Sequence, residues 1–158
     1  MKKSILSAIL IAGLIVGSAD ILMAFLHAYA KNGATPDKVL RYVASGVFGK
    51  KAFVADNTYI VFLGLLFHYV VAFIFTTIFF FIYPNIKWLS INRILTGILY
   101  GILMWSAMSF IVLPLSNTPA PKKFDVKNAL IAVTILIIAI GIPLSYMAHK
   151  FYSSRKYE

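Results

Sequence analysis

Four long apolar stretches constrain the fold of this chain more than any other feature of its sequence. They cover residues 4–30, 58–83, 93–115 and 126–151. A helix needs about 20 apolar residues to cross a hydrocarbon core of about 30 Å, so each stretch is long enough for one crossing. Hydrophobic residues make up 61% of the chain and charged residues 13%, against about a quarter charged in soluble domains. The sequence therefore predicts an all-α integral membrane protein with four transmembrane helices, in a single domain over residues 1–158.

Positive charge gathers at the ends of the apolar stretches. The formal net charge is +10, and the Lys and Arg residues lie almost wholly in short clusters that flank these stretches. This distribution predicts contact with anionic lipid headgroups and no nucleic-acid partner. Four crossings place both termini on one side of the membrane. The basic residues on that side are Lys2, Lys3, Lys87, Arg93, Lys150, Arg155 and Lys156, and those on the other side are Lys31, Lys38, Arg41, Lys50, Lys51, Lys122, Lys123 and Lys127. The two sides carry seven and eight basic residues, a difference too small for the positive-inside rule to predict the orientation.

Asp20 is the only carboxylate inside an apolar stretch. It belongs to a stripe of small and polar residues in the first stretch, together with Gly13, Gly17, Ala24 and His27. At about 100° per residue these five positions fall within a band about 80° wide on one helix face. Gly13 and Gly17 form a GxxxG pair, which allows a second helix to approach closely. A carboxylate near the bilayer centre costs several kcal/mol unless it is protonated or paired, so Asp20 requires a partner.

His68 is the predicted partner of Asp20. The second stretch repeats the pattern of the first, with Gly64 and His68 four residues apart on one face. Asp20 lies ten residues before the end of the first stretch and His68 ten residues after the start of the second, so both lie about 15 Å from the same membrane face. We expect their side chains to form a hydrogen bond near the midplane, lined by Gly17 and Gly64, and to titrate as a pair.

The connection between the first two stretches contains the signals of a short helix. Thr35, Pro36 and Asp37 supply a capping hydroxyl, a proline for the first turn and an acid. The apolar positions that follow share one side, and they are Val39, Leu40, Val43 and Val47. This pattern predicts an amphipathic helix that lies along the membrane interface and ends near Gly46 and Gly49.

The last two stretches carry packing signals and no charged group near their centres. Gly97 and Gly101 form a second GxxxG pair, which predicts close helix packing. Pro143, after Gly141 and Ile142, predicts a kink in the fourth helix.

Several kinds of chemistry find no support in the sequence. The chain has no Cys, which excludes disulfides and thiolate ligands. His27, His68 and His149 lie at different depths, so we expect no metal site. Only five acidic residues are present and no nucleophile motif, which predicts a protein that is not an enzyme and holds no cofactor.

Part of the sequence resembles a known family. The positions that carry the resemblance are Gly64, His68, Phe73, Tyr83, Pro84, Ile86, Lys87, Gly97, Gly101, Met108, Leu113, Pro114, Leu115 and Pro119. They are similar to a family of small bacterial inner-membrane proteins of unknown function, one branch of which is linked to acid resistance. The resemblance covers about residues 64–121 and implies a multi-pass protein of the bacterial inner membrane. Family members carry a histidine early in the fourth helix, whereas this chain has residues 128–134 without one.

Three hypotheses of function follow from these residues. The first is transport of protons or a small solute through a midplane site formed by Asp20 and His68, with His27 as a further candidate. The second is an accessory or assembly subunit of a larger membrane complex, in which the polar pair only fixes helix packing. The third is a haem protein with His27 and His68 as axial ligands, which a depth difference of about 10 Å disfavours. A homodimer would supply the second half that a four-helix carrier lacks.

Overall fold

The computed structural model describes residues 4–54, 58–119 and 125–156, and all regular structure in these residues is helical. The longer helices are α1 (Ile5–Asn32), α2 (Pro36–Phe48), α4 (Thr58–Ile82), α5 (Arg93–Ala107), α7 (Val126–Leu136) and α8 (Ile142–Lys156). The shorter elements are α3 (Lys51–Val54), α6 (Leu113–Leu115), two 3-10 turns (Tyr83–Asn85 and Lys87–Ser90) and two π-helical turns (Met108–Val112 and Ile137–Gly141).

Four helical segments of the described chain are long and apolar enough to cross a membrane. They are Ile5–Asn32, Thr58–Asn85, Arg93–Leu115 and Val126–Ser154. The prediction of an all-α, multi-pass membrane protein is thereby confirmed. The last two segments are composite, because a π-helical turn joins α5 to α6 and another joins α7 to α8.

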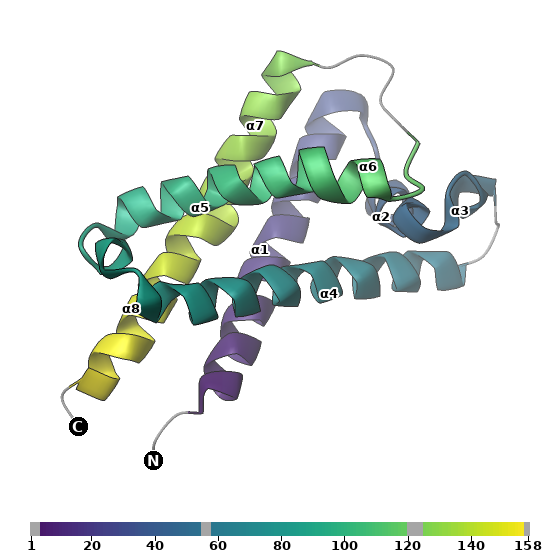
Figure 1. The fold of residues 1–158 in the computed structure, drawn as a ribbon. Helices are drawn as coiled ribbons and strands as arrows, with labels where there is room; N and C mark the ends of the chain where they lie inside the picture. The colour runs from purple at the N-terminus through teal and green to yellow at the C-terminus, as the bar shows by residue number, and fades with distance from the viewer. Residues whose placement is uncertain (1–3, 55–57, 120–124, 157–158) are drawn as a thin grey trace.

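The helices cross one another. In Figure 1, α1 and the α7–α8 segment lie along roughly the same axis with opposite chain directions, and α4 and α5 pass across them. α1 contacts α4, α7 and α8, while α5 contacts α7 and α8. α1 begins and α8 ends at the same end of the molecule (Figure 1). Fully buried side chains include Val16 of α1, Phe79 and Phe80 of α4 and Leu144 of α8. Many other large apolar side chains are exposed, as expected where lipid covers the surface.

Two backbones touch where α5 crosses the fourth apolar segment. Gly97 and Gly101 are buried and face the π-helical turn that precedes α8. A Cβ atom on Gly97 would lie 2.6 Å from Ile142 Cα, and one on Gly101 would lie 2.7 Å from Ile137 Cα. Neither position has room for a side chain. The second GxxxG pair therefore lies directly against the backbone of the helix that carries Pro143.

A π-helical turn accompanies Pro143. The amide of Ile142 donates to the carbonyl of Ile137, five residues back, and Pro143 follows at the next position. A proline ring has no amide hydrogen and crowds the carbonyl four residues before it. A wider turn relieves that crowding, and π-helical turns are a known cause of helix irregularity. The kink predicted at Pro143 thus takes the form of a π-helical turn just before the proline. The π-helical turn Met108–Val112 precedes Pro114 in the same way.

α2 begins where the sequence predicted a helix. Thr35 has an extended backbone at the N-cap, and Pro36 opens the first turn. The Thr35 side chain does not cap a backbone amide. Its hydroxyl instead donates a hydrogen bond to Asp37, and this bond is the main cause that lowers the pKa of the exposed Asp37 carboxyl.

The buried face of α2 differs from the predicted stripe. Leu40, Ala44 and Ser45 are buried, whereas Val47 is 53% exposed. The reason is that α2 folds back onto α4, where a Cβ atom on Gly64 would lie 2.7 Å from the carbonyl carbon of Leu40. Small residues on both helices allow this contact, so packing against α4 selects the face of α2. Placement of α2 along the membrane interface stays a prediction.

The C-terminal end of α2 is tied to the end of the third apolar segment. The Asn117 amide donates to the Gly46 carbonyl over 2.9 Å, and the Asn117 side-chain amide donates to the Val47 carbonyl over 3.0 Å. These are carbonyls of the last turn, which lack partners within the helix. Gly49 then ends α2 with φ +58°, a left-handed conformation that favours glycine.

Candidate functional site at the crossing of α1 and α4

Small residues bring α1 and α4 into close contact. A Cβ atom on Gly17 would lie 3.2 Å from the Cβ of Ala72 and 3.2 Å from the ring of Tyr69. One turn earlier in α1, a Cβ atom on Gly13 would lie 2.5 Å from Cε1 of Phe73. The first GxxxG pair therefore meets the side chains of α4, and this crossing contains most of the predicted polar residues.

His68 is held by a backbone carbonyl of α1. Its Nε2 lies 2.9 Å from the carbonyl oxygen of Gly17. A carbonyl oxygen can only accept, so Nε2 carries the hydrogen and donates it. The neutral ring then presents an unprotonated Nδ1, which is the atom available for a second proton. The Tyr69 ring packs edge-on against the His68 ring, with the ring centroids 5.5 Å apart.

Asp20 lies beside His68 without a hydrogen bond to it. The carboxyl group is partly buried, and the His68 ring is close enough for electrostatic attraction. Among the hydrogen bonds and ion pairs of residues 4–54, 58–119 and 125–156, none joins these two side chains, so the predicted direct hydrogen bond is wrong. The physical reason is the missing side chain of Gly17. It allows the His68 ring to reach the helix backbone, which lies closer than the carboxyl group three residues further along.

Gly64 was predicted to line the Asp20 and His68 site, but the structure places it elsewhere. It is buried against α2, next to the backbone of Leu40. His68 and Ala72 follow on the same face of α4, but they contact α1. The reason is that α2 and α1 pack against different parts of α4. The sequence showed the shared face but not that two different helices pack against it.

A second polar contact at this crossing, between Ser18 and Tyr69, was not predicted from the sequence. The hydroxyls of Ser18 and Tyr69 lie 2.7 Å apart, and this pair is 51 residues apart in sequence, like Gly17 and His68. The two contacts therefore follow one register between the helices. Once Gly17 is paired with His68, the next position on each helix gives Ser18 and Tyr69, which is the signal that could have found them.

The other two histidines lie apart from this site. His27 is partly buried, seven residues beyond Asp20, which is about 10 Å along the helix axis. His149, in α8, accepts or donates a hydrogen bond of 3.1 Å between its Nδ1 and the hydroxyl of Tyr83. Among the described residues, no three His, Asp or Glu side chains come together in a group that could hold a metal ion.

Comparison with known proteins adds no relative. No family model matches the chain, and no curated protein or solved structure is detectably similar to it. The resemblance noted over residues 64–121 stays a prediction.

The arrangement at the crossing suits proton exchange. A carboxyl group and an imidazole that interact electrostatically can hold zero, one or two protons between them, and each proton changes the charge of the site. The Gly17 carbonyl fixes the orientation of the ring in each of these states because it binds the Nε2 hydrogen of both neutral and protonated imidazole.

Proposed function

We propose that this protein moves protons, alone or with a small solute, across the bacterial inner membrane, and that Asp20 and His68 form the site that takes up and releases the proton. The observation that supports this most is a carboxylate inside an apolar segment beside an imidazole whose Nδ1 is free to accept a proton. Ionisable groups at this depth are costly and mark ion or substrate pathways in membrane proteins. The proposal does not involve an enzymatic reaction or a bound cofactor.

The roles of the two residues follow from their surroundings. Asp20 is the group whose charge the apolar segment disfavours, so it holds the proton in the resting state. Transfer to Nδ1 of His68 creates a carboxylate and an imidazolium that attract each other. Release of the proton from His68 leaves the Asp20 carboxylate as a single charge, so the next proton must reach Asp20 as the first one leaves.

Proton flux in proteoliposomes tests the proposal. Purified protein is reconstituted with a pH-sensitive dye inside the vesicles, and a potassium gradient with valinomycin drives proton entry. Asp20→Asn should lower the flux by about tenfold or more, and Asp20→Glu should retain a substantial part of it. Asp37→Asn is the matched control, because it removes an exposed carboxylate outside the apolar segments and should leave the flux unchanged.

The result for Asp20→Asn also separates the alternatives. If the folded variant supports the same flux as the wild-type protein, the transport proposal is overturned. A lower unfolding temperature together with a protein partner that co-purifies from native membranes would then identify an accessory subunit. A visible absorption band from the purified protein would point instead to a haem protein.

A further inference from the structure

A basic pocket lies between the start of α5 and the last turns of α8, away from the Asp20 and His68 site. Its volume is about 420 Å³, and it is lined by Arg93, Tyr146, Met147, His149, Lys150 and Ser153. Five of these residues belong to α8, and Arg93 is the first residue of α5. The pocket therefore joins the two helices at the end of the molecule where the chain ends.

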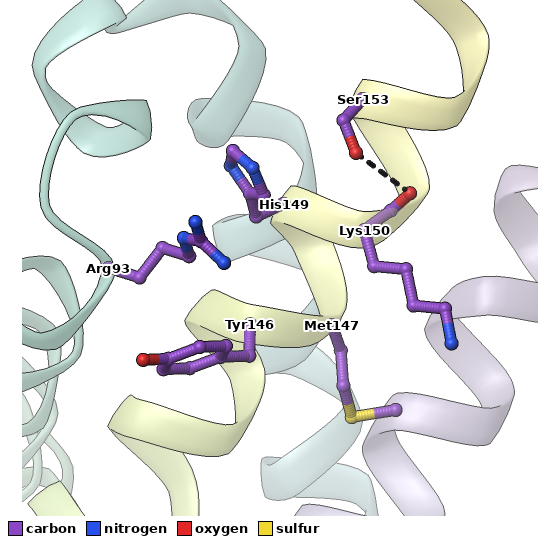
Figure 2. A pocket seen from close by; sticks show the side chains of 6 residues that line it. All are labelled: Arg93, Tyr146, Met147, His149, Lys150 and Ser153. Atoms are coloured by element: carbon purple, nitrogen blue, oxygen red, sulfur yellow. Dashed lines mark hydrogen bonds between the residues drawn. The ribbon is translucent and has the colours of Figure 1, made fainter.

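The polar groups of the pocket share one face of α8. Tyr146, His149, Lys150 and Ser153 follow the spacing i, i+3, i+4 and i+7, which places them on one side of a helix. In Figure 2 the guanidinium group of Arg93 reaches toward α8 between His149 and Tyr146, and the Lys150 side chain extends to the opposite side of Met147. The Arg93 guanidinium and the Lys150 ammonium thus lie on opposite sides of Met147.

Arg93 is held in place by an aromatic ring. Its guanidinium carbon lies 5.3 Å from the centroid of the Tyr146 ring, within the range of a cation–π contact. Among the hydrogen bonds of the described residues, none uses the Arg93 guanidinium, so its N–H groups are available to a ligand. A planar guanidinium with free edge donors suits two-point binding of a phosphate group.

His149 is oriented by its contact with Tyr83, whose hydroxyl lies 3.1 Å from Nδ1. This leaves Nε2 as the second polar atom of the ring. Tyr83 is buried, so the ring is fixed from the side of α4. The geometry gives the pocket a positioned imidazole edge next to the Arg93 guanidinium, as Figure 2 shows.

The positive charge of the pocket is not neutralised by the described part of the chain. No ion pair joins Arg93 or Lys150 to a carboxylate in residues 4–54, 58–119 and 125–156. Asp37 lies in the first turn of α2 and Asp125 is the N-cap of α7, both on the other side of the four spans, and Asp20 lies within α1. Both cations therefore remain available to an anion from outside the described chain.

The depth of the pocket matches the level of lipid phosphates. Arg93 opens the apolar segment Arg93–Leu115, and Lys150 lies four residues before the end of Val126–Ser154, about 6 Å along the helix. We propose that this pocket binds the phosphate group of an anion, with Arg93 and His149 as direct ligands and Lys150 as a second cation. A phospholipid headgroup and free phosphate share this chemistry, and basic pockets between membrane helices are suited to lipid phosphates. The inference does not depend on the proton-handling role of Asp20 and His68.

Native mass spectrometry and thermal unfolding of the full chain in mild detergent test the proposal. The probes are phosphatidylglycerol, phosphatidylcholine and inorganic phosphate. The wild-type protein should retain phosphatidylglycerol in preference to phosphatidylcholine and unfold at a higher temperature in its presence. The double variant Arg93→Gln/Lys150→Gln should bind phosphatidylglycerol roughly thirtyfold more weakly, as expected for two charges at the membrane surface.

The control is Lys31→Gln/Lys127→Gln, which removes the same charge from exposed residues at the other ends of the spans. This variant should bind phosphatidylglycerol like the wild-type protein. If inorganic phosphate alone raises the unfolding temperature of the wild-type protein but not of the Arg93→Gln/Lys150→Gln variant, and displaces the lipid, free phosphate is the ligand. Equal loss of lipid in both double variants, or no binding of either anionic probe by the wild-type protein, would overturn the proposal.

Discussion

Two helix crossings in this protein use the same GxxxG spacing for different purposes. At the α5 crossing, Gly97 and Gly101 lie against the backbone of the π-helical turn Ile137–Gly141, and no titratable side chain separates them. At the α1 crossing, Gly13 and Gly17 lie against side chains of α4. One crossing is a direct contact between backbones, and the other includes polar side chains.

The difference shows what a small residue contributes in each place. Where backbone meets backbone, glycine allows close packing of two helices in lipid. Where backbone meets side chains, glycine exposes a carbonyl oxygen, and the Gly17 carbonyl binds His68. The first arrangement stabilises the fold, and the second positions the groups that we propose handle the proton.

Substitution at the backbone crossing should have the largest effect. In Gly97→Ala, the new Cβ would lie 2.6 Å from Ile142 Cα and 2.7 Å from Ile142 N, and backbone atoms cannot move aside as a side chain can. We expect a loss of about 3 kcal/mol in the free energy of unfolding, measured by reversible unfolding in mixed detergent micelles.

The matched control for this variant is Gly46→Ala. A Cβ atom there would meet Thr118 Oγ1 at 3.6 Å and Ser116 Cβ at 3.8 Å, which is ordinary contact. Its stability should stay equal to that of the wild-type protein or rise slightly. Equal stability of both variants would show that the two backbones do not touch at Gly97.

Substitution at the side-chain crossing should have a smaller effect. The Cβ of Gly13→Ala would meet Cε1 of Phe73 at 2.5 Å, but this atom belongs to a ring that can shift. We expect a loss of about 1 kcal/mol in the same unfolding assay. The second substitution Phe73→Leu should recover part of that loss by making room, and a loss as large as that of Gly97→Ala would contradict the distinction between the two crossings.

The hydrogen bond between Ser18 and Tyr69 should give the smallest effect. A double-mutant cycle with Ser18→Ala and Tyr69→Phe should yield a coupling energy of about 0.6 kcal/mol, the usual value for a hydrogen bond between membrane helices. Additive losses, with no coupling, would show that the two hydroxyls do not bind each other. Proton flux should change little in either variant, because neither hydroxyl belongs to the proposed proton site.

Parts of the fold could be predicted from the sequence because they depend on local pattern. The four apolar stretches gave the four membrane helices, and the structure extends them only at the ends, for example from residue 30 to Asn32 in α1. The start of α2 at Pro36 followed from its capping residues. The buried face of α2 could not be predicted, because contact with Gly64 of α4 selects it.

The candidate site was only partly predictable. Equal depth in two helices indicated that Asp20 and His68 approach each other, and they do interact electrostatically. The partner of His68 is nevertheless the Gly17 carbonyl, because the rotation of two crossing helices decides which atom comes within hydrogen-bonding distance. Sequence spacing along one helix contains no information on that rotation.

The sequence by itself determined that the chain spans a membrane as four helices and that Asp20 needs a partner there. Both conclusions follow from the energetics of placing apolar and charged groups in lipid, which each residue brings with it. The tertiary structure alone decided which backbone holds His68, that Gly97 touches the fourth apolar segment, and that Arg93 meets His149 and Lys150 in one pocket. These depend on crossing geometry between segments far apart in the chain, which no local pattern encodes.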